Sequence, residues 1–155
     1  MVNLERRQAL KTGGALGLWG LFLSLGLVPQ GAQAEWNKPL FSAKTMNEAL
    51  DGLGAILPAS SEAIALTVPE IAENGAVVPV SVTSTLPDTT RIMVFVDKNP
   101  NVLAADFSFP AGTEGFVTTR VKMGQTAQVI VLVKADGKLY RAAREVKVTQ
   151  GGCGG

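Results

Sequence analysis

The alternation of apolar and polar residues from about residue 64 to residue 148 constrains the fold more than any other feature of the chain. A period of two is typical of β-strands with one buried face, and the breaks between runs mark turns. The expected inward-facing residues are Ile64, Leu66 and Val68; Val78, Val80 and Val82; Ile92, Val94 and Val96; Val129, Val131 and Val133; and Tyr140, Ala142, Val146 and Val148. Arg144 is an exception within the last run. Two weaker segments, 101–110 and 115–123, bring the expected strands to about six or seven.

Asn-Gly and Asp-Gly dipeptides are the strongest short-range turn signals in the sequence. Asn74-Gly75 predicts a two-residue hairpin between the first two runs, and Asp136-Gly137 predicts another between the last two. Pro69 and Pro79 lack a backbone N–H, so we expect them at edges or bulges. Short strands joined by such turns predict a mainly β fold, an immunoglobulin-like antiparallel β-sandwich.

A short helix is expected ahead of the first strand. Thr45 and Glu48 form a capping-box sequence at its start, and Pro58 ends it. Its apolar residues recur at spacings of three or four: Met46, Leu50, Leu53 and Leu57. We expect this apolar stripe to cover one end or edge of a sheet rather than to bind a ligand. Residues 35–44 are expected to be a loose lead-in.

The first 34 residues have the three parts of a cleavable export signal. A basic start with Arg6-Arg7 is followed by an apolar stretch over 13–28 and by Ala32-Gln33-Ala34. The paired arginines predict a twin-arginine type of signal, cut after Ala34, and a periplasmic protein. An uncleaved anchor is disfavoured because the apolar stretch is shorter than the ~20 residues of a membrane span.

Cleavage would leave a domain at 35–149 and a glycine-rich arm at 150–155. In this mature part, acidic side chains outnumber basic ones by one. Such a balance gives no reason to expect nucleic acid or an anionic membrane as a partner, and no stable membrane association is expected after processing.

The composition excludes several kinds of active site. The chain has no histidine and one cysteine, so a Ser-His-Asp or Cys-His catalytic pair and an inter-sheet disulfide are excluded within it. No spacing of cysteine and carboxylate residues resembles a zinc or calcium site. Asp97, Asp106 and Asp136 lie near expected turns, where carboxylates cap the backbone. We therefore expect no metal, no cofactor and no catalytic residue, and an enzyme acting alone is disfavoured.

The chemistry of the chain is concentrated in its last five residues, Gly151-Gly152-Cys153-Gly154-Gly155. If the last strand ends near Thr149, four further residues carry Cys153 up to about 13 Å beyond the sheet. Gly151, Gly152, Gly154 and Gly155 have no side chains, so the arm is thin enough to enter a narrow cleft with the thiol. Nothing basic lies closer in sequence than Lys147, so we expect a visited enzyme to activate the thiol. These properties suit a carrier arm.

Two alternative functions of the single cysteine are also considered. An exported structural or assembly module could use Cys153 for a lasting disulfide to another chain, since an unpaired cysteine in an exported protein suggests either an intermolecular link or a reactive thiol. A thiol oxidoreductase is disfavoured because a C-x-x-C site needs a second cysteine.

The terminal pentapeptide, the twin-arginine-like start and the helix before "AIALTVPEIAENGAVVPVSV" together resemble the SoxY family, the sulfur-carrier subunits of bacterial thiosulfate oxidation. The similarity extends over essentially the whole mature chain. It implies an immunoglobulin-like sandwich that pairs with a second sandwich subunit, SoxZ, and it implies that Cys153 is the attachment point of pathway intermediates.

The resemblance also implies the enzymes that visit the arm. A haem-containing sulfur transferase would join thiosulfate to the thiol, and a hydrolase would release sulfate. In some bacteria a molybdenum-containing sulfur dehydrogenase would oxidise the remaining sulfur, and hydrolysis would regenerate the carrier.

Overall fold

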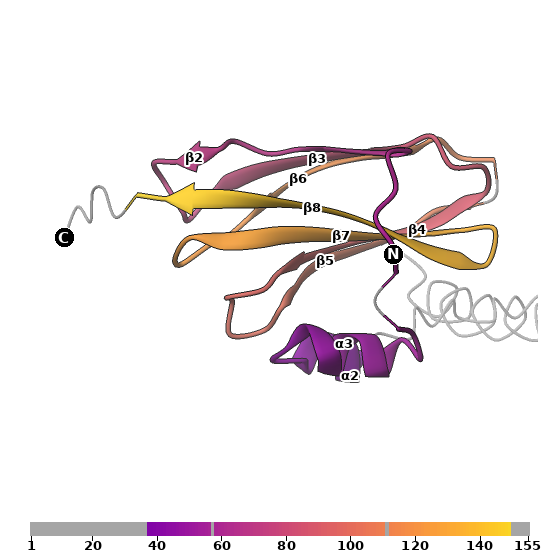
Figure 1. Cartoon of the computed structure of the whole chain (residues 1–155), viewed down its shortest axis with the longest axis horizontal. Helices are drawn as coiled ribbons and strands as arrows, with labels where there is room; N and C mark the ends of the chain where they lie inside the picture. Colours follow the sequence, from indigo (N-terminus) through magenta and orange to yellow (C-terminus); the bar gives the residue numbers. More distant parts are fainter. Residues whose placement is uncertain (1–36, 57, 111, 150–155) are drawn as a thin grey trace, which may run out of the picture. The chain divides into compact units, whose positions relative to one another are not determined.

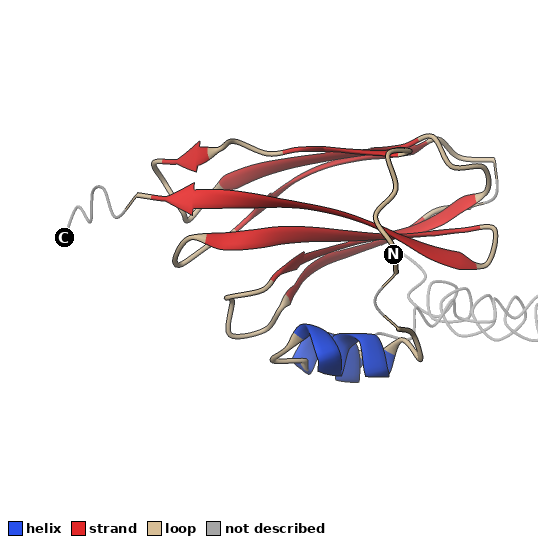
Figure 2. Ribbon diagram, viewed as in Figure 1, coloured by secondary structure: helices blue, strands red, loops and turns tan. Residues whose placement is uncertain are grey.

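The structure is a computed structural model that describes residues 37–56, 58–110 and 112–149. Two β-sheets face each other, and two short helices lie against the larger sheet (Figures 1 and 2). The mainly β sandwich with an N-terminal helix is therefore confirmed. The predicted export signal, residues 1–34, lies outside the described residues.

Each sheet is built from strands that are distant in sequence. The smaller sheet has the order β1 (Ile64–Thr67), β3 (Val78–Ser84), β6 (Gly115–Val121). The larger sheet has the order β2 (Ile71–Ala72), β8 (Lys138–Val148), β7 (Ala127–Ala135), β4 (Thr89–Val96), β5 (Leu103–Ser108). Strand neighbours are antiparallel except β2 and β8, which are parallel. The antiparallel prediction thus holds for every pair of strands but that one.

The core between the sheets consists mainly of the residues expected from the alternation. Those that are buried in it are Ile64, Leu66, Val78, Val80, Val82, Ile92, Val94, Val96, Val129, Val131, Val133 and Val146. Val68, Tyr140, Ala142 and Val148 are half-buried and pack against this core. Arg144 is exposed, as its exception to the pattern suggested.

Strands β4 and β7 are buried on both faces, which explains their continuous apolar runs over 92–96 and 129–133. Their second face packs against the helices α2 (Lys38–Ser42) and α3 (Met46–Gly52). The residues of this second cluster are Leu40, Ala43, Ala49, Leu50, Met93, Phe95, Val102, Leu103, Ile130 and Leu132. The prediction that the helix covers an end or edge of a sheet is therefore wrong, because it covers the outer face of the larger sheet.

The capping box at Thr45 is confirmed. Thr45 Oγ1 accepts a hydrogen bond from Glu48 N–H over 3.2 Å, and Glu48 Oε2 accepts one from Lys44 N–H over 2.7 Å. The predicted loose lead-in over 35–44 is wrong, because α2 forms there. Asn37 Oδ1 caps α2 by accepting from Leu40 N–H over 3.2 Å, and the burial of Leu40 holds the helix on the sheet.

The two turn signals have different outcomes. At Asp136-Gly137 the predicted hairpin is confirmed, since Ala135 pairs with Lys138 and both turn residues have positive φ. At Asn74-Gly75 the predicted hairpin is wrong. Strands β1 and β3 do pair, but the chain between them crosses to the larger sheet and forms β2. Asn74 still makes a local turn, accepting from Ala76 N–H at Oδ1 over 2.9 Å.

The two prolines lie where a missing N–H is tolerated. Pro69 lies between β1 and β2, outside both strands. Pro79 pairs with Arg120 of β6, and the pairing of β3 with β1 begins only at Ser81. Pro79 therefore has a strand neighbour on one side, as the sequence predicted for an edge position.

Candidate functional site

The predicted attachment point Cys153 and the arm glycines Gly151, Gly152, Gly154 and Gly155 lie outside the described residues. The structure instead shows the strand that leads to them. Strand β8 is the longest of the described strands and ends beside β2 (Figure 1), two residues before the start of the predicted arm in the sequence.

Hydrogen bonds on both edges hold the end of β8. Lys147 N–H donates to Glu70 O over 2.9 Å, and Thr149 N–H donates to Ala72 O over 3.2 Å. On the other edge, Val148 N–H donates to Thr126 Oγ1 over 3.1 Å. The arm therefore begins at a residue, Thr149, that the sheet anchors. We call Glu70, Ala72, Thr126 and Thr149 the arm root.

The arm was predicted from the sequence, whereas the arm root was not. Strand β2 has only two residues, so it shows no alternation that a pattern search could detect. Its parallel pairing with β8 is a contact between segments more than 70 residues apart. Only the three-dimensional structure shows that this contact anchors the chain just before the arm.

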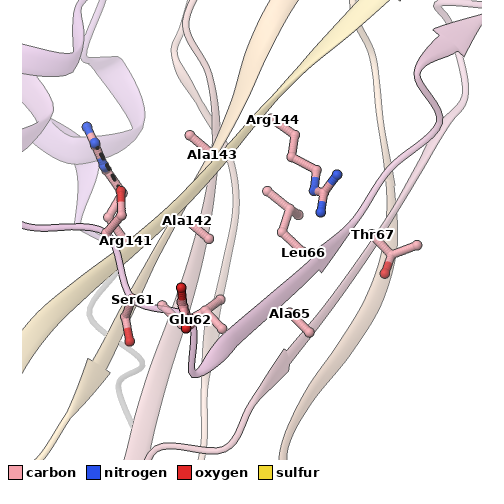
Figure 3. Close-up of a pocket in the computed structure, with 11 residues that line it drawn as sticks. Ser61, Glu62, Ala65, Leu66, Thr67, Arg141, Ala142, Ala143 and Arg144 are labelled. Atoms are coloured by element: carbon pink, nitrogen blue, oxygen red, sulfur yellow. Dashed lines mark hydrogen bonds between the residues drawn. The ribbon is translucent and has the colours of Figure 1, made fainter.

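A cleft of about 620 Å³ lies between β1 and β8. Ile64 and Leu66 of β1 and Ala142 of β8 give it an apolar lining, and Glu62 lies at one end (Figure 3). Arg144 extends from β8 over the cleft near Leu66, whereas Arg141 points the other way (Figure 3). Arg141 Nη2 donates to Ser60 Oγ over 3.2 Å.

The arm of the same chain is too short to bring its thiol into this cleft. Arg144 is the cleft residue of β8 nearest the arm, and it lies five residues, or about 16 Å, back from Thr149. The four residues from Thr149 to Cys153 span at most about 13 Å and would have to reverse direction. A second hollow of about 400 Å³ includes Leu139 near the far end of β8, about 33 Å from Thr149. Neither hollow can therefore serve Cys153 of the same chain.

The one ion pair between described residues belongs to the scaffold. Arg91 of β4 donates from Nε to Asp106 Oδ1 over 2.8 Å and from Nη2 to Asp106 Oδ2 over 2.5 Å, in the two-point geometry that guanidinium and carboxylate groups favour. The hydrogen bonds to Asp106 raise the pKa of Arg91 above its ordinary value. This pair joins β4 to β5 and lies away from the arm root.

Other kinds of site are absent from the described part of the chain. Within it, no group of three or more histidine, cysteine, aspartate or glutamate residues could hold a metal ion. Over the same residues, no helix is long and apolar enough to cross a membrane.

Comparison with known proteins places these features in a family. Residues 50–153 match the family described as "Sulfur oxidation protein SoxY", and the match ends at Cys153. The solved structure of the sulfur carrier protein SoxY from Chlorobium limicola f thiosulfatophilum is 42% identical, with a TM-score of 0.61. The alignment covers 68% of this chain and 96% of that one.

More distant structures share only the fold. Superoxide reductase (neelaredoxin) from Ignicoccus hospitalis aligns with a TM-score of 0.51 at 18% identity, over 57% of this chain and 81% of that one. A single-residue variant of the same reductase aligns with a TM-score of 0.50 at 18% identity, over 56% and 79% of the two chains. No curated protein sequence matches the chain significantly.

Proposed function

The chain belongs to the SoxY family of sulfur oxidation proteins, and we propose that it carries the sulfur of thiosulfate covalently on Cys153. The family supports a role as a sulfur carrier in sulfur oxidation. The covalent attachment to Cys153, thiosulfate as the source of the sulfur and the catalysis of each step by other proteins are the parts that we propose. The observation that carries the proposal is the anchored end of β8, four residues before a thiol that cannot reach either of the two hollows found among the described residues.

The proposed first step joins thiosulfate to the arm. The Cys153 thiol loses its proton, its sulfur bonds to the outer sulfur of thiosulfate, and two electrons pass to a haem-containing transferase. In the second step a hydrolase adds water, which breaks the bond between the outer sulfur and the sulfonate. Sulfate leaves with the release of one proton, and a persulfide stays on Cys153.

In this scheme the domain positions the Cys153 thiol, and other proteins catalyse each step. The sheet fixes Thr149, so the length of the chain keeps the thiol within about 13 Å of a defined point. A thin glycine backbone can enter an active-site channel that would exclude larger side chains. Since glycine loses much conformational freedom when it is held, docking of the arm alone should be transient.

We also propose the cellular compartment of the carrier and its partner proteins. The basic, apolar and small-residue parts of 1–34 support export by the twin-arginine route to the periplasm. Membership in the family supports a SoxZ-like subunit as a permanent partner, with the sulfur dehydrogenase as a further visitor in some bacteria.

Intact-mass spectrometry of the protein from cells supplied with thiosulfate tests the proposal. We expect adducts of thiosulfate or sulfane sulfur on the peptide that contains Cys153, and none in Cys153→Ser. A lasting disulfide from Cys153 to one other chain, present with or without thiosulfate, would contradict the carrier function and support an assembly function instead.

A further inference from the structure

The pairing of β7 with β8 stops before the arm begins. Its last pair is Ala127 with Val146, and the chain ahead of Ala127 bends over residues 124–126 instead of following β8. Strand residues direct their N–H groups to alternate edges. The N–H groups of Lys147 and Thr149 bond to the β2 segment, so the N–H of Val148 faces the side of β7, where no strand partner remains.

A side-chain hydroxyl takes the place of the missing backbone acceptor. Thr126 Oγ1 accepts the hydrogen bond from Val148 N–H over 3.1 Å. A continued ladder would have placed Gln125 opposite Val148, because Ala127 lies opposite Val146. Thr126 is exposed and is not a member of either apolar cluster. Its side chain therefore contributes a hydrogen bond to the end of β8 and not apolar packing.

The segment that carries Thr126 is itself held on both sides. Before it, Met123 N–H donates to Gly75 O over 2.6 Å, and the side chain of Met123 is buried in the core between the sheets. After it, Gln128 N–H donates to Asp97 Oδ1 over 2.9 Å. The Thr126 hydroxyl is thus presented from a segment whose two ends are bonded to other loops of the domain.

On its other edge, the end of β8 depends on a strand of only two residues. Glu70 O and Ala72 O accept from Lys147 N–H and Thr149 N–H over 2.9 and 3.2 Å. A chain end that is held by a few exposed hydrogen bonds opens at a free energy far below that of global unfolding. The bond from Thr126 is therefore a large share of what keeps the last residues of β8 in the sheet.

The state of Val148 decides how long the arm is. While Val148 is held, the tether runs over the four residues from Thr149 to Cys153 and reaches about 13 Å. When this end is released, the last fixed residue is Val146, which is fully buried, and a tether of seven residues reaches about 23 Å. The thiol then spreads over a volume about fivefold larger, which lowers its effective concentration at an active site.

We propose that Thr126 is a positioning residue for the carrier reaction: its hydroxyl keeps Val148 in the sheet and thereby holds the arm at four residues instead of seven. The inference rests on the proposed function, since a defined reach matters only if other proteins must find the thiol. A visiting enzyme then has fewer residues of the tether to order when the arm docks. In this scheme Thr126 acts through the arm and not on the sulfur.

Amide hydrogen exchange of three variants tests the anchoring. Thr126→Val removes the acceptor and keeps the shape, and Thr126→Ser keeps the acceptor. Thr118→Val is the matched control, because it removes an exposed hydroxyl that is hydrogen-bonded to Ser81 Oγ over 2.9 Å in the smaller sheet. In Thr126→Val we expect exchange at Lys147 and Thr149 to accelerate about two- to tenfold, although their own acceptors in the β2 segment are unchanged. The other two variants should exchange there as the wild type does, and exchange in β4 should stay the same in all three.

Loading kinetics test whether this anchoring serves the carrier function. The rate of thiosulfate-dependent adduct formation on Cys153 is measured against the concentration of the carrier, with a purified haem-containing transferase. We expect Thr126→Val to raise the KM for the carrier about two- to fivefold at an unchanged kcat, because the chemistry of the docked thiol is the same. Thr126→Ser and Thr118→Val should keep the wild-type KM, and a small thiol reagent should react with Cys153 at the same rate in all three variants.

Several results would overturn the inference. One is unchanged exchange at Lys147 and Thr149 in Thr126→Val, and another is equally accelerated exchange in β4, which would make Thr126 a residue of general stability. A wild-type KM in Thr126→Val, or a lowered kcat at an unchanged KM, would also count against it. Absence of any thiosulfate adduct on wild-type Cys153 would instead contradict the proposed function, and the exchange experiment would still decide whether Thr126 anchors the arm.

Discussion

Gly75 and Met123 are joined by a hydrogen bond of 2.6 Å from Met123 N–H to Gly75 O, close to the arm root. A Cβ atom on Gly75 would overlap Met123 O and would lie 2.9 Å from Val148 Cγ1. Gly75 is thus enclosed between the segment that follows β6 and the last residue of β8. Only glycine allows these segments to approach so closely.

Gly75→Ala should therefore destabilise the domain. The added methyl group meets a backbone oxygen that cannot move independently of its strand, and we expect a loss of about 1–3 kcal/mol in the free energy of unfolding. Thermal and urea unfolding of the mature protein measure this loss. Gly124→Ala is the matched control, because nothing lies within 4 Å of a Cβ at that position. Equal stability of the two variants would show that the approach at Gly75 is not tight.

Short-range sequence patterns predicted the features that depend on residues close together in the chain, namely the buried faces of the strands and one hairpin turn. The alternation in β3, β4 and β7 identified their buried faces because one residue in two must avoid water in a sandwich. The hairpin at Asp136-Gly137 followed from the dipeptide because the strands on both sides stay in one sheet. The role of Cys153 was likewise expected from the sequence, through its composition and its resemblance to a family, and it stays a prediction.

The remaining features depend on contacts between distant segments. The φ angle of Gly75 is not positive, so this position does not need glycine for a hairpin turn. It needs glycine because a Cβ atom there would overlap Met123 O. Helix α2 is too short to be stable by propensity, and the burial of Leu40 against the larger sheet accounts for it. The two-residue β2 and the cleft exist because the chain leaves β8 after Ser60 to form β1 in the smaller sheet and then returns to β8.

Leu40→Ala should test whether the helices belong to the cooperative core. Leu40 is fully buried in the cluster between the helices and the larger sheet, so its truncation leaves a cavity. We expect a loss of about 2–4 kcal/mol, measured by urea unfolding. Ile56→Ala removes a side chain that is 92% exposed and should change the stability little. A Leu40→Ala variant as stable as Ile56→Ala would indicate that the helices are not part of the folding unit.

Asp106→Asn should weaken the link between β4 and β5. The substitution removes the charge that faces Arg91 but keeps a similar shape, so Arg91 loses its ionic partner in a half-buried site. We expect a loss of about 1–2 kcal/mol by thermal unfolding. Asp136→Asn is the control, because that residue lies exposed in a turn with a φ of 47°, which asparagine also adopts. If both variants are equally stable, the ion pair contributes nothing to the fold.

Deletion of Gly151-Gly152 should show whether the length of the arm matters for loading independently of the chemical reactivity of the Cys153 thiol. The deletion shortens the span from Thr149 to Cys153 by about 7 Å, which would withdraw the thiol from the depth of a visiting active site. We expect thiosulfate-dependent loading of Cys153 to fall by at least about a hundredfold, since small misplacements of reacting groups have effects of that size. The rate of reaction with a small thiol reagent should stay within about twofold, because such a reagent needs no reach. The control is deletion of Gly154-Gly155, which removes the same number of glycines and leaves the span from Thr149 to Cys153 unchanged. Equal loading of Cys153 in the two deletion variants would contradict the proposed carrier arm.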